Sequence, residues 1–247
     1  MRRFLIALQF LTVLPVKIGS EIKKEDFGAS LLYFPAVGLL IGLLLSLTAL
    51  SFSFLPVLVK SAVILILSIL ITGGIHLDGF ADTCDGFYGN KSVEKVLEIM
   101  RDSRIGAMGV IGIVSLLLFK FSVIASLPEG FLWKILIIAP VFSRWSQSLA
   151  CRTALYARRE GKAKYFMEYS RKRDVFAGGI FTLALLVLLM SLKGVILFFV
   201  SLIPVVVFLY YIKKKIGGMT GDTIGAVNEL AEMCVLLFGL VLSGVFV

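Results

Sequence analysis

Long apolar runs separated by short polar segments set the pattern of this 247-residue chain. The runs cover residues 31–55, 57–75, 105–127, 131–151, 175–191 and 194–212, and a last run follows the lysines at 213–215 and continues to the C-terminus. Each approaches the roughly 20 residues that an α-helix needs to cross a bilayer. The pattern predicts an all-α protein, a polytopic integral membrane helical bundle of about seven transmembrane helices. It forms one domain, residues 1–247.

Two shorter segments are predicted to lie along the membrane surface. The N-terminal MRRFLIALQFLTVLPV resembles a signal peptide, with Arg2 and Arg3 before an apolar run, but it lacks a clear small-residue cleavage site. We expect it to be retained as an interfacial or re-entrant segment. Ser92 is predicted to cap a short amphipathic helix, because apolar residues recur from Val93 at i, i+3, i+4 and i+7.

Composition excludes a soluble domain, since 59% of the residues are hydrophobic and the mean hydropathy is +0.99. The net charge of +9 is also found in nucleic-acid-binding proteins, but most Lys and Arg residues lie between the apolar runs, as the positive-inside rule describes. We therefore expect the lipid bilayer of the cell (inner, or plasma) membrane as partner and no nucleic acid. Alternating spans place four basic regions in the cytoplasm: the N-terminus, residues 73–106, the basic loop 152–174 and the loop at Lys213.

Residues 73–106, GGIHLDGFADTCDGFYGNKSVEKVLEIMRDSRIG, bring four aspartates into an otherwise lipid-compatible chain: Asp78, Asp82, Asp85 and Asp102. In a helix, a rotation of about 100° per residue puts the first three within an arc of roughly 60°. Like charges on one face repel each other, and cations between them relieve the repulsion. Because neither paired Cys nor clustered His accompanies them, these oxygens favour a hard ion such as Mg2+ over zinc.

A second acidic cluster lies in the last apolar run, where Asp222, Glu229 and Glu232 share an arc of about 80° near the cytoplasmic end. An ionised carboxylate inside a span costs on the order of 3 kcal/mol on insertion scales, so such groups face a cavity, a partner or an ion. We predict that these three carboxylates close the metal site from the far end of the chain. The alternative is structural: Arg144 pairs with Glu229 or Glu232 to neutralise a buried charge, and Lys120 pairs or snorkels.

Three glycines are candidates for substrate contacts. Gly79 and Gly86 flank the aspartate face and leave room beside it. Gly221 belongs to a glycine-rich loop before a helix N-terminus, where backbone N–H groups can meet an anion. The alternative for this loop is a flexible connector whose glycines cap helices.

Arg101 and Arg104 flank Asp102 and are candidates to bind phosphate through the bidentate guanidinium fork. The alternative is that both arginines are interfacial cations that interact with anionic lipid headgroups. His76 is the only histidine, and helical rotation turns it away from the aspartate face. We therefore expect a solvated interfacial residue rather than a proton shuttle.

Three strings, HLDGFADTCDGFYG, LEIMRDSRIGAMG and GGMTGDTIGAVNELAE, closely resemble motifs of the cobalamin synthase family, the adenosylcobinamide-GDP ribazoletransferases. The opening LQFLTVLPV, YFPAVGLLIG in the first span and SRWSQ in the fourth also resemble family patterns, so the resemblance extends over nearly the whole chain. Cys84 stands where a small residue such as alanine is expected, and Met108 where an aromatic residue is common. Neither departure affects a carboxylate.

The resemblance implies a late, nucleotide-loop step of cobalamin biosynthesis. A ribose hydroxyl of α-ribazole, or of its phosphate, attacks the phosphorus attached to cobinamide in adenosylcobinamide-GDP, which releases GMP and forms the nucleotide loop of adenosylcobalamin. Enzymes of this family require magnesium, and the resemblance makes Asp78, Asp82 and Asp85 the expected metal ligands. Asp82 is also the candidate to receive the hydroxyl proton, directly or through water. Asp102 and Asp222 would complete the site or hold waters around it.

Two other functions remain open. A CDP-alcohol phosphotransferase also combines magnesium, membrane helices and an aspartate-glycine motif, but its D-x-x-D-G-x-x-A-R and G-x-x-x-D-x-x-x-D pattern differs from the spacing of Asp78, Asp82 and Asp85. An ion-coupled membrane transporter is the alternative that Glu229 and Glu232 suggest, since ionisable groups within spans mark ion pathways. The sequence also leaves open whether the protein forms a homo-oligomer.

Overall fold

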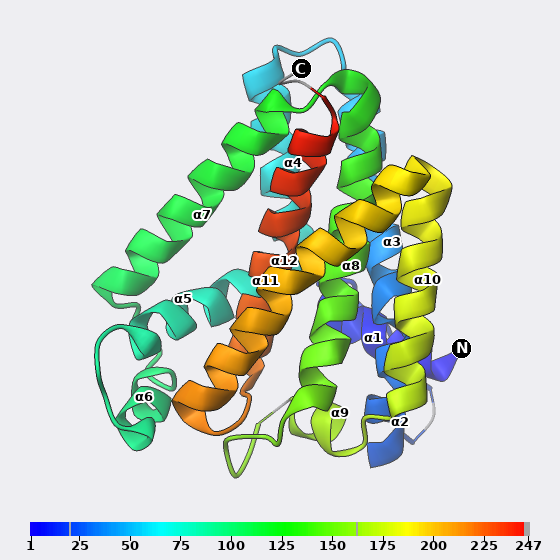
Figure 1. Ribbon diagram of the computed structural model, residues 1–247. Coiled ribbons are helices and arrows are strands. Elements are labelled where there is room, and N and C mark those ends of the chain that lie inside the picture. Colours follow the sequence, from blue (N-terminus) through cyan, green and yellow to red (C-terminus); the bar gives the residue numbers. More distant parts are fainter. Residues whose placement is uncertain (20, 162, 245–247) are drawn as a thin grey trace.

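The computed structural model describes residues 1–19, 21–161 and 163–244, and over these residues the chain is helical, with no β-strand (Figure 1). The helices are α1 (Arg2–Leu11), α2 (Lys24–Ser30), the short 3-10 helix η1 (Leu31–Tyr33), α3 (Phe34–Ser51), α4 (Val57–Thr72), α5 (Ile75–Phe87), α6 (Val93–Ile99), α7 (Ala107–Ser126), α8 (Glu129–Thr153), α9 (Lys164–Glu168), α10 (Lys172–Met190), α11 (Leu192–Ile216) and α12 (Gly221–Leu242). The predicted all-α class is confirmed.

Five segments are long and apolar enough to cross a membrane: Lys24–Ser51, which ends with α3, and the helices α7, α10, α11 and α12. The helices α4 and α5 meet the same criterion together, but the chain bends by 90° between them. The remaining predicted span is α8, which has 25 residues but carries the polar stretch SRWSQS from Ser143 to Ser148. A helical membrane bundle is therefore confirmed. Length and composition give five spans in the described part of the chain, or six with the bent pair, and the number seven stays a prediction.

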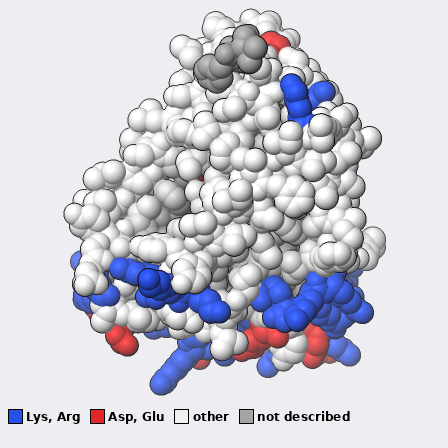
Figure 2. All heavy atoms as spheres, viewed as in Figure 1, with Lys and Arg blue, Asp and Glu red and all other residues white. Residues whose placement is uncertain are grey.

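Charged side chains gather at the two ends of the bundle and leave an apolar belt between them (Figure 2). The lower end in this view carries most of the visible Lys and Arg, together with acidic residues. Large apolar side chains are exposed along the belt, such as Leu118 of α7 at 61% and Leu188 of α10 at 79%. Only lipid makes such exposure favourable, so the belt marks the part of the protein that crosses the membrane.

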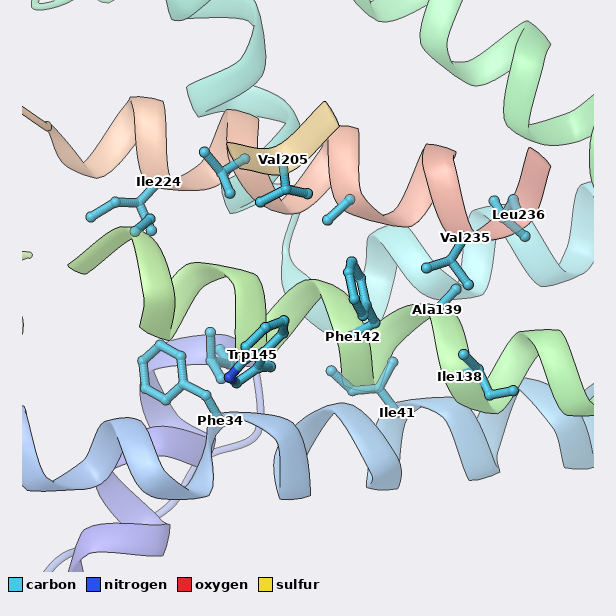
Figure 3. Close-up of a cluster of buried hydrophobic side chains, with 14 of the residues drawn as sticks. Phe34, Ile41, Ile138, Ala139, Phe142, Trp145, Val205, Ile224, Val235 and Leu236 are labelled. Carbon is cyan, nitrogen blue, oxygen red and sulfur yellow. The ribbon is translucent and has the colours of Figure 1, made fainter. Parts of the chain in front are cut away.

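The core forms around α8, which packs against α3 on one side and α12 on the other (Figure 3). Ile138 and Phe142 of α8 are fully buried in these contacts. The helices α3 and α8 approach closely because Gly38 has no side chain: an added Cβ would lie 2.4 Å from the carbonyl oxygen of Pro140. Small residues allow the same close approach in other membrane bundles. This packing fixes α12, which carries Asp222 at its start.

Both predicted surface segments are helical. In α1, the Arg2 guanidinium lies 2.7 Å from the carboxylate of Asp26, which ties the N-terminal helix to α2. In α6, the Ser92 hydroxyl accepts a hydrogen bond from the backbone N–H of Lys95 at 3.3 Å, and Val96 is buried. The predicted cap and amphipathic helix at Ser92 are confirmed.

Two consecutive glycines separate α4 from α5. Gly73 has φ +63° and Gly74 has φ +70°, a left-handed conformation that is costly for residues with a side chain. The chain turns by 90° at this point, so α5 runs across the bundle and does not continue the span of α4 (Figure 1). The aspartates of α5 are thereby placed beside the start of α12.

Candidate active site

The helix α5 carries Asp78, Asp82 and Asp85, as the spacing predicts. Asp78 is exposed, and the other two are half-buried. None of the described residues forms an ion pair or a side-chain hydrogen bond with the carboxylate of Asp78 or Asp82. The first two aspartates of the motif therefore keep their oxygens available.

The glycine at position 79 brings α12 against α5. A Cβ on Gly79 would lie 2.7 Å from the carbonyl oxygen of Asp222, and a Cβ on Gly225 would lie 3.3 Å from the Cα of His76. The helices touch backbone to backbone at this crossing, which places Asp222 beside Asp78 and Asp82. In the structure the missing side chain of Gly79 serves helix packing, and its expected contact with substrate stays a prediction.

Gly86 has a similar packing role at the other end of α5. An added Cβ would lie 2.6 Å from the Cγ of Met100, which follows α6. The predicted room for substrate beside Gly86 is filled by this side chain. The glycine instead allows the segment after α6 to pack against α5.

The acidic groups crowd around Asp82. Burial raises the pKa of Asp82 to about 7, with further upward contributions from the carboxylates of Asp222 and Asp78. The guanidinium of Arg158 acts in the opposite direction and lowers the pKa of Asp82. A carboxyl with its pKa raised by like charges is a place where a cation would bind favourably.

Asp85 has a different role from the other two aspartates. Its Oδ2 accepts a hydrogen bond from the backbone N–H of Gly106 at 2.7 Å, and its Oδ1 accepts one from Gly109 at 2.8 Å. The carboxylate thus caps the N-terminus of α7, where free N–H groups and the helix dipole favour negative charge. A Cβ at either glycine would lie 2.4 Å from the carboxylate. The G-x-x-G spacing of Gly106 and Gly109 is the signal in the sequence for this contact.

Asp222 forms an ion pair with Arg158, a residue that no motif in the sequence marks as part of a site. The Nη2 of Arg158 lies 2.6 Å from Oδ2 of Asp222 and donates a hydrogen bond to the carbonyl oxygen of Met100 at 3.2 Å. In the sequence, Arg158 counted only as one of several cations in the basic loop 152–174. Two residues 64 positions apart share no periodic pattern, so only the fold could pair them.

Glu229 and Glu232 lie in a buried ion network and do not join the aspartates. Lys120 of α7 approaches Glu229 at 2.5 Å and Glu232 at 2.7 Å, and Arg144 of α8 approaches Glu232 at 2.9 Å. Two cations and two carboxylates balance each other. Glu229 follows Asp222 by seven residues, which is about 10 Å along a helix. The structure therefore confirms the alternative, in which Arg144 and Lys120 pair with these carboxylates, and the expected ligand role of both glutamates stays a prediction.

The remaining substrate-binding candidates lie at or near the charged end. Arg101, Asp102 and Arg104 are exposed after α6, and Arg104 donates to Asp102 through Nε at 3.0 Å and Nη2 at 2.7 Å. This pairing lowers the pKa of Asp102 to about 2. Gly221 is the first residue of α12, after the Thr220 side chain has capped the helix by accepting from Thr223 at 3.2 Å.

The prediction that His76 is exposed to solvent is wrong. Its side chain is only 4% exposed, and it lines an interior cavity together with Lys120, Arg144, Glu229 and Glu232. Rotation correctly turned it away from the aspartates, but the opposite face of α5 packs against the bundle interior rather than water.

The metal centre is not preformed among the described residues, where no group of three or more Asp, Glu, His or Cys residues is arranged to hold an ion. Asp85 is engaged by backbone N–H groups and Asp222 by Arg158. The chemistry of the donors nevertheless fits magnesium, because Asp78 and Asp82 offer hard oxygens that the described residues leave unpaired.

The fold and the site first define a class: a multi-pass helical membrane protein with a carboxylate-rich site beside the charged end of its bundle. Comparison with known proteins then gives the family. The family model described as cobalamin-5-phosphate synthase matches residues 3–241, and the chain belongs to this family.

Close relatives carry one name, adenosylcobinamide-GDP ribazoletransferase. The protein of Clostridium acetobutylicum is 37% identical over 96% of this chain and 94% of the relative. The relative from Alkaliphilus metalliredigens is 38% identical over 99% of this chain and 97% of its own, and that from Geotalea daltonii is 34% identical over the full length of both. No solved structure matches the chain. The family resemblance drawn from the motifs is confirmed.

Proposed function

We propose that this protein joins adenosylcobinamide-GDP to α-ribazole, or to α-ribazole phosphate, and releases GMP. The product is adenosylcobalamin, or its phosphate. The observation that carries the proposal is the match over nearly the full length to ribazoletransferases, with the HLDGFADTCDG string on α5 at a site of unpaired carboxylates. The same match favours this reaction over a CDP-alcohol phosphotransferase or an ion-coupled transporter.

The reaction exchanges one phosphorus–oxygen bond for another. The hydroxyl oxygen of the ribose bonds to the phosphorus attached to cobinamide, the bond from that phosphorus to the GMP oxygen breaks, and the hydroxyl proton goes to a base. Asp82 is our candidate for that base, directly or through water, because the charges of Asp78 and Asp222 raise the pKa of its carboxyl and it has no partner of its own among the described residues.

Asp78, Asp82 and Asp222 are the residues that would hold magnesium. Bound there, the ion would neutralise charge on the diphosphate, which is the main requirement of phosphoryl transfer. Asp85 would act beside them by fixing the start of α7 against α5. Arg101 and Arg104 would take phosphate oxygens, for which guanidinium groups are well suited.

We place the site on the cytoplasmic side of the cell membrane. The support is the concentration of Lys and Arg at the end of the bundle beside α5 and the start of α12 (Figure 2). A positive surface at that end also attracts an anionic nucleotide substrate from solution.

An assay of purified protein in lipid with magnesium tests the reaction. GMP should appear only when both adenosylcobinamide-GDP and α-ribazole, or its phosphate, are supplied. Failure to release GMP from either acceptor would overturn the proposal. Flux of a substrate across sealed vesicles, without GMP release, would favour the transporter.

A further inference from the structure

Arg158 is the one cationic side chain that forms an ion pair with the aspartates of the site in the described part of the chain. Four carboxylates gather there: Asp78, Asp82, Asp85 and Asp222. A single guanidinium leaves most of this negative charge uncompensated. Because Arg158 pairs with Asp222, a cation that enters the site competes with this guanidinium for the carboxylate of Asp222.

The guanidinium of Arg158 has two partners but does not use all of its N–H donors. Its Nη2 contacts Asp222 at 2.6 Å and the carbonyl oxygen of Met100 at 3.2 Å. Its Nε is buried and has no acceptor among the described residues. Since a guanidinium has five N–H donors, Arg158 keeps capacity for a further anion.

The backbone that carries Arg158 is fixed to the start of α12. The N–H of Ala157 donates to the carbonyl oxygen of Met219 at 2.8 Å, and the N–H of Met219 donates to that of Leu155 at 2.9 Å. Gly218 permits this pairing, because an added Cβ would lie 2.5 Å from the oxygen of Leu155. The long side chain of Arg158 can thus change partner while its backbone stays in place.

We propose that Arg158 is a resident counter-ion that a divalent cation replaces at Asp222, and that the freed guanidinium then binds the diphosphate of the nucleotide substrate. This inference rests on the proposed function. It accounts for the arrangement of the site: Oδ2 of Asp222 contacts Arg158, so a metal ion that takes this oxygen must displace the guanidinium. A doubly charged ion among several carboxylates competes well against one guanidinium. The fork of Arg158 also matches phosphate oxygens.

The test compares Arg158→Gln with the wild type in lipid nanodiscs, with Mn2+ as an EPR-visible probe and no substrate present. Removing the competing cation should tighten Mn2+ binding by about fivefold or more. The same variant should raise the KM for adenosylcobinamide-GDP by about tenfold or more, because a charged hydrogen bond is lost. A merely structural residue would weaken metal binding, or leave it unchanged.

Two further variants serve as controls for Arg158→Gln. Arg159→Gln removes the same charge from the adjacent, exposed position and should leave both quantities near those of the wild type. Arg158→Lys keeps the charge but loses the fork, so Mn2+ affinity should stay near the wild-type value while the KM rises. This variant preserves a cation for Asp222 and decides the matter if Arg158→Gln does not fold.

Each outcome has one meaning. If the wild type binds Mn2+ in an Asp82-dependent way but Arg158→Gln binds it no more tightly than Arg159→Gln, the exchange is wrong and the proposed function stands. An unchanged KM in Arg158→Lys would also show that the exchange is wrong while the proposed function stands. If the wild type releases GMP yet shows no Asp82-dependent Mn2+ binding, the aspartate metal site fails, and the exchange fails with it.

Discussion

The partner of each carboxylate decides what that carboxylate can do. Asp78 and Asp82 have no partner among the described residues, Asp85 accepts two backbone N–H groups, and Asp222 holds Arg158. Four residues of one chemical type thus divide into free oxygens, a helix cap and one half of an ion pair. The free pair is the part of the site most open to a cation.

Glu232 tests the difference between a ligand and a structural ion. Its two oxygens contact Arg144 at 2.9 Å and Lys120 at 2.7 Å inside the bundle. Glu232→Gln should lower the Tm of the purified protein by several degrees, because breaking a buried pair costs about 3–5 kcal/mol. Mn2+ binding by the folded protein should remain. Glu98→Gln, a change at an exposed position of α6, is the control and should alter neither the Tm nor Mn2+ binding.

The opposite result would restore the original expectation. Loss of Mn2+ binding in Glu232→Gln at an unchanged Tm would make Glu232 a metal ligand. The sequence could not choose between these roles. Its periodicity gave the face of the helix correctly, but the partners Lys120 and Arg144 come from two other helices that no local pattern connects to it.

At the scale of elements, the crossing of α5 and α12 makes the site. Gly73 and Gly74 turn the chain by 90°, and Gly79 then lets α12 approach until its backbone touches α5. Without either feature, Asp222 would lie away from the motif. The glycines of this region therefore serve geometry, whereas the sequence suggested substrate contacts for Gly79 and Gly86.

Gly79→Ala tests the crossing. The added methyl group would lie 2.7 Å from the carbonyl oxygen of Asp222, so the helices must separate. Overpacking of this kind costs about 1–3 kcal/mol, and we expect a lower Tm together with a clear loss of GMP release. Gly130→Ala in α8 is the matched control, because its Cβ meets nothing within 4 Å. Normal Tm and turnover in Gly79→Ala would contradict the proposed role of the crossing.

The sequence predicted the elements better than their contacts. Apolar runs located the long helices, and the capping signal at Ser92 located α6. The 90° turn before α5 is not evident in the sequence, because apolar residues continue on both sides of Gly73 and Gly74 as far as Ile75. The ion pair of Arg158 and Asp222 was missed because it depends on two loops that meet only in the folded protein.

At the scale of the whole molecule, the bundle separates two environments. Its apolar belt excludes water, while one end carries most of the visible Lys and Arg together with acidic residues (Figure 2). The short helices and loops at that end bring residues from three distant segments to one place: α5, the loop that carries Arg158 and the start of α12. A membrane bundle of this form can hold a polar reaction at its surface without opening its core.

The most direct test of the proposed active site is GMP release by Asp82→Asn in lipid with magnesium, measured beside the wild type and Glu98→Gln. The change removes one negative charge at nearly constant volume, so the protein should insert and fold normally while turnover is abolished. Glu98→Gln should retain wild-type turnover. Near-normal GMP release by correctly inserted Asp82→Asn would contradict the account, because it would remove Asp82 from the site of transfer.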